Sequence, residues 1–457
     1  MLLFYTRVLA PADYGIIDIL NVLTTLLNFI IALEISQGVA IYYSEAKTDS
    51  ERVAYASAAL WFTVITNSLF LIVALALSKP LSLLVLGADN LQSVFQAAAL
   101  YMYGNGIFYL LQNQLRWQLK PKLYAVSGIV FSLVSAATTT ILLFYFNSGV
   151  IGVFYGLFAG EILAITVACY FLRASYKLIF DLQKCLQMLA FSTPLVVSSI
   201  SIWVFLSIDR IAINKLMTLT DVGLYGVGYR LASIVSLFLT GFYGALTPII
   251  FNNYEKPNTP KELAKIFRYF LALILPLLVA LSVFSPEIII VSANADYYPA
   301  SQVIPLLAPA IVLSNMFIFA PGLELAKKTA QIATINLIAA LINTILNFIL
   351  IPYIGIAGAA LATLVTTLVT FSSYMIASQK LYYIPHEWRR IITVTLISVS
   401  FGFIGFYLEE LIKLPITFVV PVKCLLMIVC IALLSWLLLG IHEIRTLTKI
   451  ITFRKKP

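Results

Sequence analysis

Residues 14–43 read YGIIDILNVLTTLLNFIIALEISQGVAIYY, an apolar run long enough to cross a membrane as a helix. Comparable runs recur along the whole 457-residue chain, which is 61% hydrophobic and only 11% charged. Because a soluble domain carries about 25% charged residues, this apolar surface cannot be hidden in one core. Alternation with a period of two residues is absent, which disfavours an outer-membrane barrel. The sequence therefore predicts an all-α polytopic membrane protein.

Apolar runs between polar breaks predict thirteen full transmembrane helices and a short apolar stub at residues 1–6. The expected spans are 14–43, 54–77, 94–115, 125–146, 150–172, 186–208, 222–248, 264–285, 302–325, 332–352, 355–378, 390–408 and 417–439. The four cysteines and two histidines form no cluster with metal-ligand spacing, so the sequence predicts neither a metal site nor a cofactor.

The distribution of Lys and Arg predicts the orientation, because short cytoplasmic loops hold an excess of cations. If the loop at 44–53 is cytoplasmic, the loops on its side hold 22 of the 29 cations and the opposite side holds six, while Arg230 lies inside a span. One miscounted span would abolish so uneven a split. We therefore expect a multi-pass protein of the cell membrane with a cytoplasmic C-terminus. The net charge of +9 then needs no nucleic-acid partner.

Two short motifs repeat at nearly the same offset. Asp13-Tyr14-Gly15 recurs 208 residues later as Asp221-Val222-Gly223, and Gly149-Val150-Ile151-Gly152 recurs 206 residues later as Gly355-Ile356-Ala357-Gly358. Each motif starts a span, which predicts two six-helix halves with the same helix order. A complete helix precedes the motif in the second half, whereas only six residues precede Arg7 in the first. We expect a fourteenth helix in the full protein, missing here through a misassigned start or a truncation.

The repeat also predicts the domains. Residues 1–175 are expected to form an N-terminal lobe with a truncated first helix, and residues 185–380 a C-terminal lobe. Residues 388–440 would then hold two appended transmembrane helices, and residues 441–457 a basic cytoplasmic tail.

Polar residues fall on one face of several spans, which at membrane depth is typical of helices that line a wet cavity. Through the offset of 208, Asn21 and Asn28 align with Tyr229 and Ser236 in the second half. We expect these faces to form a shared polar cavity, and the alternative is hydrogen bonding between helices of a packed bundle. The candidate sugar-binding residues are Asn21, Asn28, Tyr101, Asn105, Tyr109, Gln112, Tyr225, Tyr229, Ser233, Ser236 and Tyr243.

Charged residues within or at the ends of spans are candidates for an anion site and for coupling to an ion. Arg7 and Arg210 occupy external helix ends, where they either converge on an anion or snorkel to lipid phosphates. Arg230 lies beside its polar face, and Arg116 continues the polar face of the span at 94–115. The candidate coupling acids are Asp18, Glu34, Glu161 and Glu324. Glu34 lies on the side of its helix opposite the asparagines, which favours a structural ion pair.

Several activities are disfavoured by missing features. The chain has no Walker-type phosphate loop, so it is not expected to hydrolyse ATP. Its predicted external loops are too short for the catalytic domain of a membrane glycosyltransferase or ligase. We therefore expect a transporter and no enzyme.

Residues 7–15, RVLAPADYG, resemble the R-x-L-x-P-x-x-Y-G start of the polysaccharide-export flippases of O-antigen (Wzx) type, within the MATE-like MOP transporter superfamily. Further residues that match this pattern are Pro194, Trp203, Asp209, Arg210, Gly223, Tyr225, Pro248, Lys327, Lys328, Thr329, Asn343, Leu346, Asn347, Ile351, Pro352, Gly355, Gly358, Ala359, Ala360, Ala362, Thr363 and Tyr383. The resemblance covers essentially the whole chain, and its motifs are specific to the superfamily but not to one substrate.

The resemblance implies two six-helix lobes in a V around a central cavity, with two helices appended. It implies that alternating access moves a lipid-diphosphate-linked oligosaccharide, the repeat unit of a polysaccharide such as lipopolysaccharide O-antigen, from the cytoplasmic to the outer leaflet. The expected partners are this polyprenyl-linked substrate, membrane lipids and other membrane proteins of polysaccharide assembly.

Two other functions predict different features of the sequence. A multidrug exporter of MATE type, coupled to protons or cations, predicts a dominant acidic group in the cavity, and only Asp18 lies on a polar face. A scaffold for cytosolic enzymes predicts long cytoplasmic segments, which the chain lacks.

Overall fold

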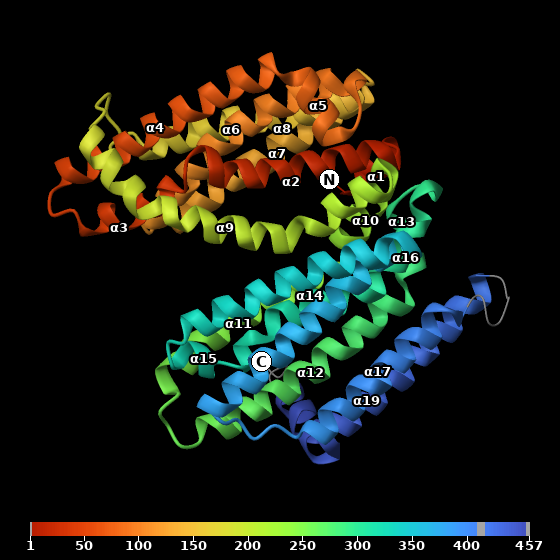
Figure 1. The fold of residues 1–457 in the computed structure, drawn as a ribbon. Coiled ribbons are helices and arrows are strands. Elements are labelled where there is room, and N and C mark those ends of the chain that lie inside the picture. Colours follow the sequence, from red (N-terminus) through yellow and green to blue (C-terminus); the bar gives the residue numbers. More distant parts are fainter. Residues whose placement is uncertain (1, 409–415, 454–457) are drawn as a thin grey trace. The chain divides into compact units, whose positions relative to one another are not determined.

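The structure is a computed structural model that describes residues 2–408 and 416–453. In this part of the chain the regular elements are helices, with no strand. They form two compact units, Met1–Gly223 and Leu224–Pro457, which run from red to yellow-green and from green to blue in Figure 1. The prediction of an all-α fold is confirmed.

The first unit is built from nine α-helices and the start of a tenth, and α4, α6, α7 and α8 lie side by side in it (Figure 1). Its elements are α1 (Leu2–Val8), α2 (Pro11–Ile31), α3 (Ile35–Glu45), α4 (Asp49–Ala76), α5 (Ser78–Leu86), η1 (Asp89–Leu91), α6 (Gln92–Trp117), α7 (Pro121–Phe144), α8 (Gly149–Leu172), α9 (Leu182–Leu216) and the first residues of α10 (Leu219–Ala232).

Small residues let α7 and α8 approach closely. Gly156 and Gly160 of α8 face Thr139 and Ser135 of α7, and a Cβ added at either glycine would lie about 2 Å from the opposing hydroxyl oxygen. Membrane helices associate through this kind of small-residue contact, because burial against lipid-like chains supplies no driving force. The pair α7 and α8 therefore forms a rigid support for the residues of α8 that face α6.

The predicted span at 14–43 is interrupted, which corrects the expectation of one continuous helix. Leu33 and Glu34 adopt left-handed backbone angles, with φ of 48° and 53°, between α2 and α3. The Ser192 hydroxyl of α9 donates to the Leu33 carbonyl at 2.8 Å, which satisfies an acceptor that the break removes from the helix. No glycine or proline occurs at residues 32–34, so the break could not be predicted from the usual helix-breaking residues.

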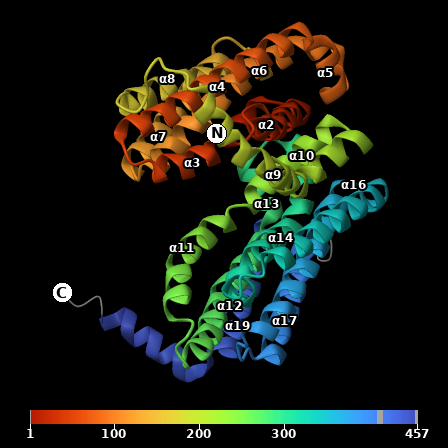
Figure 2. The ribbon, with the colours of Figure 1, turned by 60° about the vertical axis from the view of Figure 1, so that its left-hand side comes forward.

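The second unit begins with the rest of α10, from Leu224. Its other elements are α11 (Val235–Asn253), α12 (Thr259–Val283), α13 (Ser285–Ser292), η2 (Ala295–Val303), α14 (Ile304–Asn315), η3 (Met316–Phe319), α15 (Gly322–Leu325), α16 (Thr329–Leu381), α17 (Trp388–Phe406) and α19 (Ile416–Phe453). Figure 2 shows α17 and α19 alongside α12, in agreement with their contacts.

The predicted span at 222–248 is also broken, into α10 and α11. The hydroxyls of Ser233 and Ser236 donate to the carbonyls of Arg230 and Ser233, three residues back, at 2.7 and 2.6 Å. Such bonds compete with the regular helix ladder and explain the break.

The first glycine of each repeated glycine motif has a positive φ angle. Gly149 at the start of α8 and Gly355 within α16 have φ of +54° and +61°, a region that glycine enters without strain. Gly355 and Ile354 divide α16 into Thr329–Tyr353 and Ile356–Leu381, each long enough to cross a membrane. The two predicted spans at 332–352 and 355–378 thus correspond to the two parts of α16 on either side of this kink.

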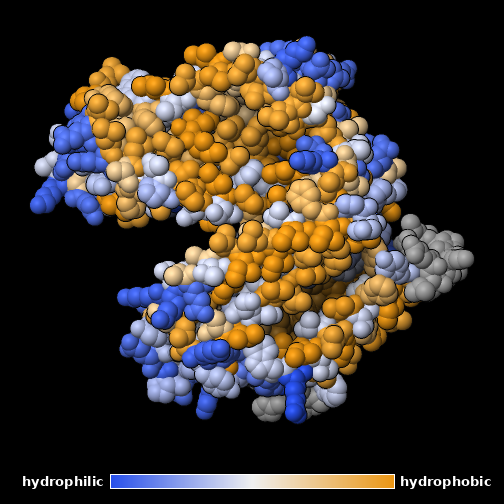
Figure 3. Space-filling view, viewed as in Figure 1, coloured by the Kyte–Doolittle hydropathy of each residue, from blue (hydrophilic) through white to orange (hydrophobic). Residues whose placement is uncertain are grey.

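Eleven helices of the described residues are long and apolar enough to span a membrane, or twelve if α5 and α6, bent by 119°, are one span. Figure 3 shows a largely hydrophobic flank on the first unit, with hydrophilic residues at its ends. A multi-pass membrane protein is therefore supported, and the count of thirteen full spans stays a prediction.

Candidate functional site

Three helices of the first unit are joined by a line of polar side chains. The Asn28 amide of α2 donates to Asn105 Oδ1 of α6 at 2.8 Å, and Asn105 Nδ2 donates to Glu161 Oε1 of α8 at 2.7 Å. Asn28 and Asn105 are half-buried, whereas Glu161 is fully buried. The structure thus brings together two asparagines that helical periodicity selected, Asn28 and Asn105, and one of the candidate coupling acids, Glu161.

Two glycines give this line its space. A Cβ at Gly104 would lie 2.5 Å from Glu161 Oε2, and a Cβ at Gly106 would lie 2.3 Å from Asn67 Oδ1 of α4. Asn67 is buried and was not among the predicted site residues. Its signal was weak, since it is the only asparagine in the span predicted at 54–77.

A buried ion pair lies nearer the N-terminus of α2. Arg210 Nε of α9 donates to Asp18 Oδ2 at 2.8 Å, and both side chains are less than a tenth exposed. The predicted anion-binding arginine therefore has a carboxylate partner in this state. A guanidinium that is held by one carboxylate has the charge and geometry to bind a phosphate group in its place.

Glu34 lies at the break between α2 and α3, buried against α9. Its Oε1 accepts a hydrogen bond from the Ser199 hydroxyl at 2.7 Å, and its Oε2 has no hydrogen-bond partner among the described residues. The ion pair expected for Glu34 is thus replaced by a hydroxyl. The N-terminus of α3 begins at the next residue, where the helix dipole favours a negative charge.

The remaining polar candidates of α6 differ in burial. Tyr101 is buried against the Phe154 ring, with centroids 6.0 Å apart, while Tyr109 is half-buried. Gln112 is half-buried and donates to Ser127 of α7 at 3.2 Å. They therefore follow one helix but do not share one environment.

The cations at the helix ends are more exposed. Arg116 donates to Asn113 Oδ1 at 2.9 Å, with its guanidinium 4.8 Å from the centre of the Trp117 ring, and Arg7 in α1 is exposed. Asn21 in α2 is half-buried. Neither arginine lies in the Asp18–Arg210 pair.

A groove on the first unit lies between α6 and α7. It has a volume of about 540 Å³ and is lined by Gln112, Tyr124, Ala125, Gly128, Ile129, Ser132 and Leu133. An amide, a phenol and a hydroxyl beside apolar residues suit the mixed polar and apolar surface of a sugar.

In the second unit the candidates of α10 and α11 are mostly within the protein. Tyr225 is fully buried, while Tyr229, Arg230, Ser233 and Ser236 are half-buried. The two serine hydroxyls bond to their own helix as described above. Their donors are therefore already used, which a polar face in the sequence does not reveal.

Two further candidates lie at the other end of this unit. Tyr243 Oη accepts a hydrogen bond from the Ile318 N–H at 3.2 Å. Glu324 is exposed, in the short helix α15. In the described part of the chain, no three His, Cys, Asp or Glu side chains gather where they could hold a metal ion.

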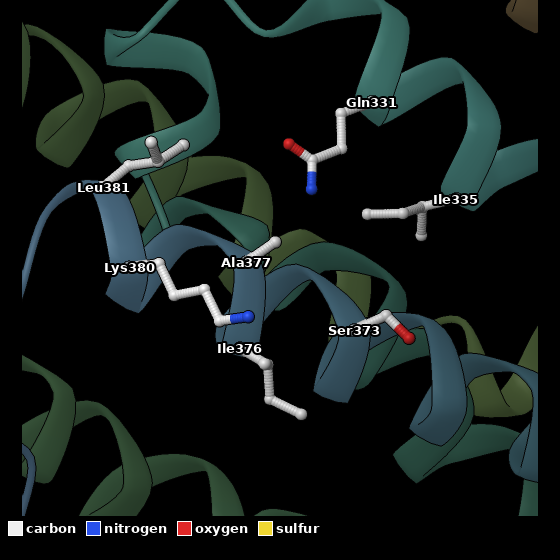
Figure 4. Close-up of a pocket in the computed structure, with 7 residues that line it drawn as sticks. All are labelled: Gln331, Ile335, Ser373, Ile376, Ala377, Lys380 and Leu381. Atoms are coloured by element: carbon white, nitrogen blue, oxygen red, sulfur yellow. The ribbon is translucent and has the colours of Figure 1, made fainter.

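A second groove lies between the two parts of α16 and has a volume of about 430 Å³. Figure 4 shows the Gln331 amide and the Lys380 ammonium group turned toward the space between them. The Ser373 hydroxyl points away from this space and donates to the Val369 carbonyl at 2.8 Å. Apolar side chains complete the lining, namely Ile335, Ile376, Ala377 and Leu381. Through the offset of 206, Ile335 corresponds to Ile129 in the groove of the first unit. Equivalent helices of the two halves thus each border a groove.

Comparison with known families identifies the chain. Residues 4–302 match the sequence profile described as "Polysaccharide biosynthesis protein". The chain belongs to this family. One relative is the "Probable low-salt glycan biosynthesis flippase Agl15" of Haloferax volcanii, 25% identical over 261 residues that cover 54% of each chain. The matched region spans about half the length of that relative.

Solved structures of two membrane transporters share the fold of this chain. The inward closed conformation of the lipid II flippase MurJ has a TM-score of 0.72, with 15% identity and 95% of each chain covered. An inward-facing multidrug resistance MATE transporter of the MOP superfamily has a TM-score of 0.66, with 14% identity, covering 83% of this chain and 93% of its own. At such identities the likeness establishes the fold of this polysaccharide biosynthesis protein.

Proposed function

We propose that this chain carries a polyprenyl-diphosphate-linked oligosaccharide from the cytoplasmic to the outer leaflet of the cell membrane by alternating access. The observation that carries the proposal is the line of amides that connects α2, α6 and α8 inside a chain of the polysaccharide biosynthesis family. Amides at membrane depth are costly unless they serve packing or a polar ligand. Asn28 and Asn105 are half-buried, so they remain within reach of a ligand.

The Asp18–Arg210 pair supports binding of the diphosphate. A phosphate group, like a carboxylate, can accept two hydrogen bonds from a guanidinium, and a diphosphate carries more charge, so it can take the guanidinium from Asp18. In this proposal Arg210 is the anchor, and the other anion candidates, Arg7, Arg116 and Arg230, attract the headgroup as it enters or leaves.

The oligosaccharide would contact the aromatic and amide side chains. Sugar rings pack their C–H faces on aromatic rings, and their hydroxyls bond to amides and hydroxyls. Tyr109, Gln112 and the groove beside Tyr124 offer such groups in the first unit, and Tyr229 and Tyr243 offer them in the second. Tyr101 and Tyr225 are buried and would support this surface from behind.

The two halves of the sequence repeat are the parts of the protein that would move during transport. Residues 1–175 and 185–380 act as the two lobes, residues 388–440 as appended helices and residues 441–457 as a cytoplasmic tail. Within the first unit α9 packs against α2, α3 and α4. The C-terminus and the loops rich in Lys and Arg would face the cytoplasm. Membrane lipids and other proteins of polysaccharide assembly are the proposed partners.

A deletion strain tests the function. Loss of the gene should abolish the surface polysaccharide and accumulate its lipid-linked precursor in the cytoplasmic leaflet, and the wild-type gene should reverse both changes. Surface polysaccharide that persists in a clean deletion without a paralogue would refute the proposal. Purified protein that exports a cationic dye from vesicles, but moves no lipid-linked sugar, would support a MATE-type exporter in its place.

A further inference from the structure

Glu161 is the most deeply buried carboxyl group in the described part of the first unit. It lies at the middle of α8 and is fully buried, and its Oε1 accepts one hydrogen bond, from Asn105. Its Oε2 has no hydrogen-bond partner among the described residues. An ionised carboxylate in such a place is far less stable than in water, whereas the neutral acid is tolerated.

Oε2 fits against α6 only because the facing residue has no side chain. Gly104 of α6 faces this oxygen, at a distance that leaves no room for a Cβ. Next to it, Gly160 is in contact with Ser135 of α7. On the side of α6 the carboxyl group is therefore bordered by Gly104, and no cation is paired with it among the described residues.

The elements packed against α8 carry other titratable groups, and the structure joins none of these by a described hydrogen bond or ion pair to Glu161. They are Asp13, Tyr14 and Asp18 in α2, Tyr101, Tyr103, Tyr109 and Arg116 in α6, and Lys122 and Tyr124 in α7. Asp18 is held by Arg210, and Arg116 is bonded to Asn113. Glu161 is therefore free to change its charge without breaking a described ion pair.

The three other candidate acids are less suited to bind a proton in the membrane. Asp18 is ion-paired with Arg210, and Glu34 lies at the N-terminus of α3 and accepts a hydrogen bond from Ser199. Glu324 is exposed at the end of the second unit. Among these four acids, only Glu161 is completely buried, has a carboxylate oxygen without a hydrogen-bond partner and has no charged partner among the described residues.

From these contacts we infer that Glu161 binds a proton during the transport cycle, and that Asn105 and Asn28 link this proton to the substrate. The inference rests on the proposed function for its substrate. A hydronium ion in the water that reaches the half-buried Asn105 gives up one proton, its O–H bond breaks, and the proton bonds to a carboxylate oxygen of Glu161. The products are a water molecule and the neutral acid. No other covalent bond changes.

The direction of the hydrogen bonds gives the sign of the coupling. In the ionised state Asn105 donates to Glu161 and accepts from Asn28. Once Glu161 is protonated, its O–H can donate to Asn105 after the amide turns over, and the Asn28 N–H is released toward a sugar hydroxyl. Proton binding therefore favours substrate binding, and by linkage substrate binding favours protonation to the same extent.

The first test observes the proton directly and needs no substrate. Infrared difference spectra of the full chain in lipid vesicles, recorded between neutral and acidic pH, should contain a carbonyl band of a buried carboxylic acid. Glu161→Gln should remove this band, whereas Glu324→Gln, a matched loss of an exposed acid, should leave it. An unchanged band in Glu161→Gln would overturn the inference.

The second test measures transport in proteoliposomes with a fluorescent polyprenyl-diphosphate N-acetylglucosamine as the probe. A pH gradient should change the flipping rate of the wild type and of Glu324→Gln at least about fivefold, and should leave Glu161→Gln unaffected. Asn105→Leu retains the carboxyl group but breaks the link, so it should keep the infrared band and lose the pH effect. A full pH effect in Glu161→Gln, or a response only to a sodium gradient, would overturn the inference.

The two readouts separate the hypotheses. Wild-type protein that shows the infrared band but never moves the probe would contradict the proposed function and leave the proton site standing. If the wild type flips the probe but Glu161→Gln does not alter the band, the proposed function stands and the proton site is contradicted.

Discussion

Gly15 of α2 and Gly223 of α10 pack backbone to backbone, and their contact is reciprocal. A Cβ at Gly15 would lie 1.8 Å from the Leu219 carbonyl oxygen, and a Cβ at Gly223 would lie 1.9 Å from that of Pro11. Both glycines and both carbonyls are related by the same offset of 208 residues. The repeat seen in the sequence is thus also a symmetric contact within the first unit.

Alanine at Gly15 or Gly223 should destabilise the protein, because a methyl group would overlap with backbone that cannot move as a side chain does. Overpacking of this kind costs about 1–3 kcal/mol. Thermal unfolding of purified protein in detergent, followed by size-exclusion chromatography, measures the loss. Gly244→Ala is the matched control, since no atom lies within 4 Å of the added Cβ. Equal melting temperatures for all three variants would contradict the close contact.

The same motifs show what the sequence could and could not reveal. Asp13 caps α2 by accepting from the Ala10 N–H at 3.2 Å, and Asp221 accepts from the Thr218 N–H at 3.1 Å. These local bonds span three residues, so spacing alone predicts them. Helix periodicity likewise predicts membrane spans, because burial in lipid requires long apolar runs whatever the tertiary packing.

Contacts between distant segments could not be predicted. The pair Asp18–Arg210 depends on which faces of α2 and α9 meet, and neither periodicity nor composition contains that information. A polar face of a helix can either support packing or line a cavity, and the sequence pattern is the same in both cases. Asn343 and Asn347 lie on such a face, yet both are buried, and Asn347 donates to the Asn343 carbonyl at 2.9 Å. Those asparagines support packing, whereas Asn28 remains half-buried.

Replacement of the Asp18–Arg210 pair separates stability from transport. Arg210→Ala should cost about 3–5 kcal/mol, because Asp18 would be left buried without its cation. The double variant Asp18→Leu with Arg210→Met should recover most of this stability, since apolar side chains of similar size replace the pair. If Arg210 anchors the diphosphate, the double variant stays inactive in probe flipping. A stable double variant with wild-type flipping would assign the pair a structural role only.

His386 predicts a pH dependence of stability. It lies between α16 and α17, where its ring packs 4.9 Å from Phe267 and 5.2 Å from Trp388. Burial lowers the pKa of His386 from 6.5 to about 4. Between these pH values the unfolded chain binds the proton and the folded chain does not, so stability falls as the pH drops from about 6.5 to 4. The full loss is up to about 3 kcal/mol.

The variant His386→Phe keeps an aromatic ring in this place but cannot bind a proton. Its melting temperature should therefore change less than that of the wild type between pH 7 and pH 4.5. The same measurement at pH 8, where both rings are neutral, controls for the change in packing. Parallel curves for the two proteins over the whole range would show that another group governs the pH response.

A buried cation fixes the last membrane helix to the second unit. Lys423 of α19 is fully buried, and its Nζ donates to Glu287 Oε1 of α13 at 2.6 Å. Lys423→Ala should destabilise the unit by about 3–5 kcal/mol, because Glu287 would lose its cation in a largely buried site. Adding Glu287→Gln to Lys423→Met should restore part of the loss, since no uncompensated charge then remains. Because this pair lies far along the chain from Arg210 and Glu161, the double variant should flip the probe at a rate near that of the wild type. A loss of flipping in a protein that is stable in detergent would show that the docking of α19 is needed for transport itself.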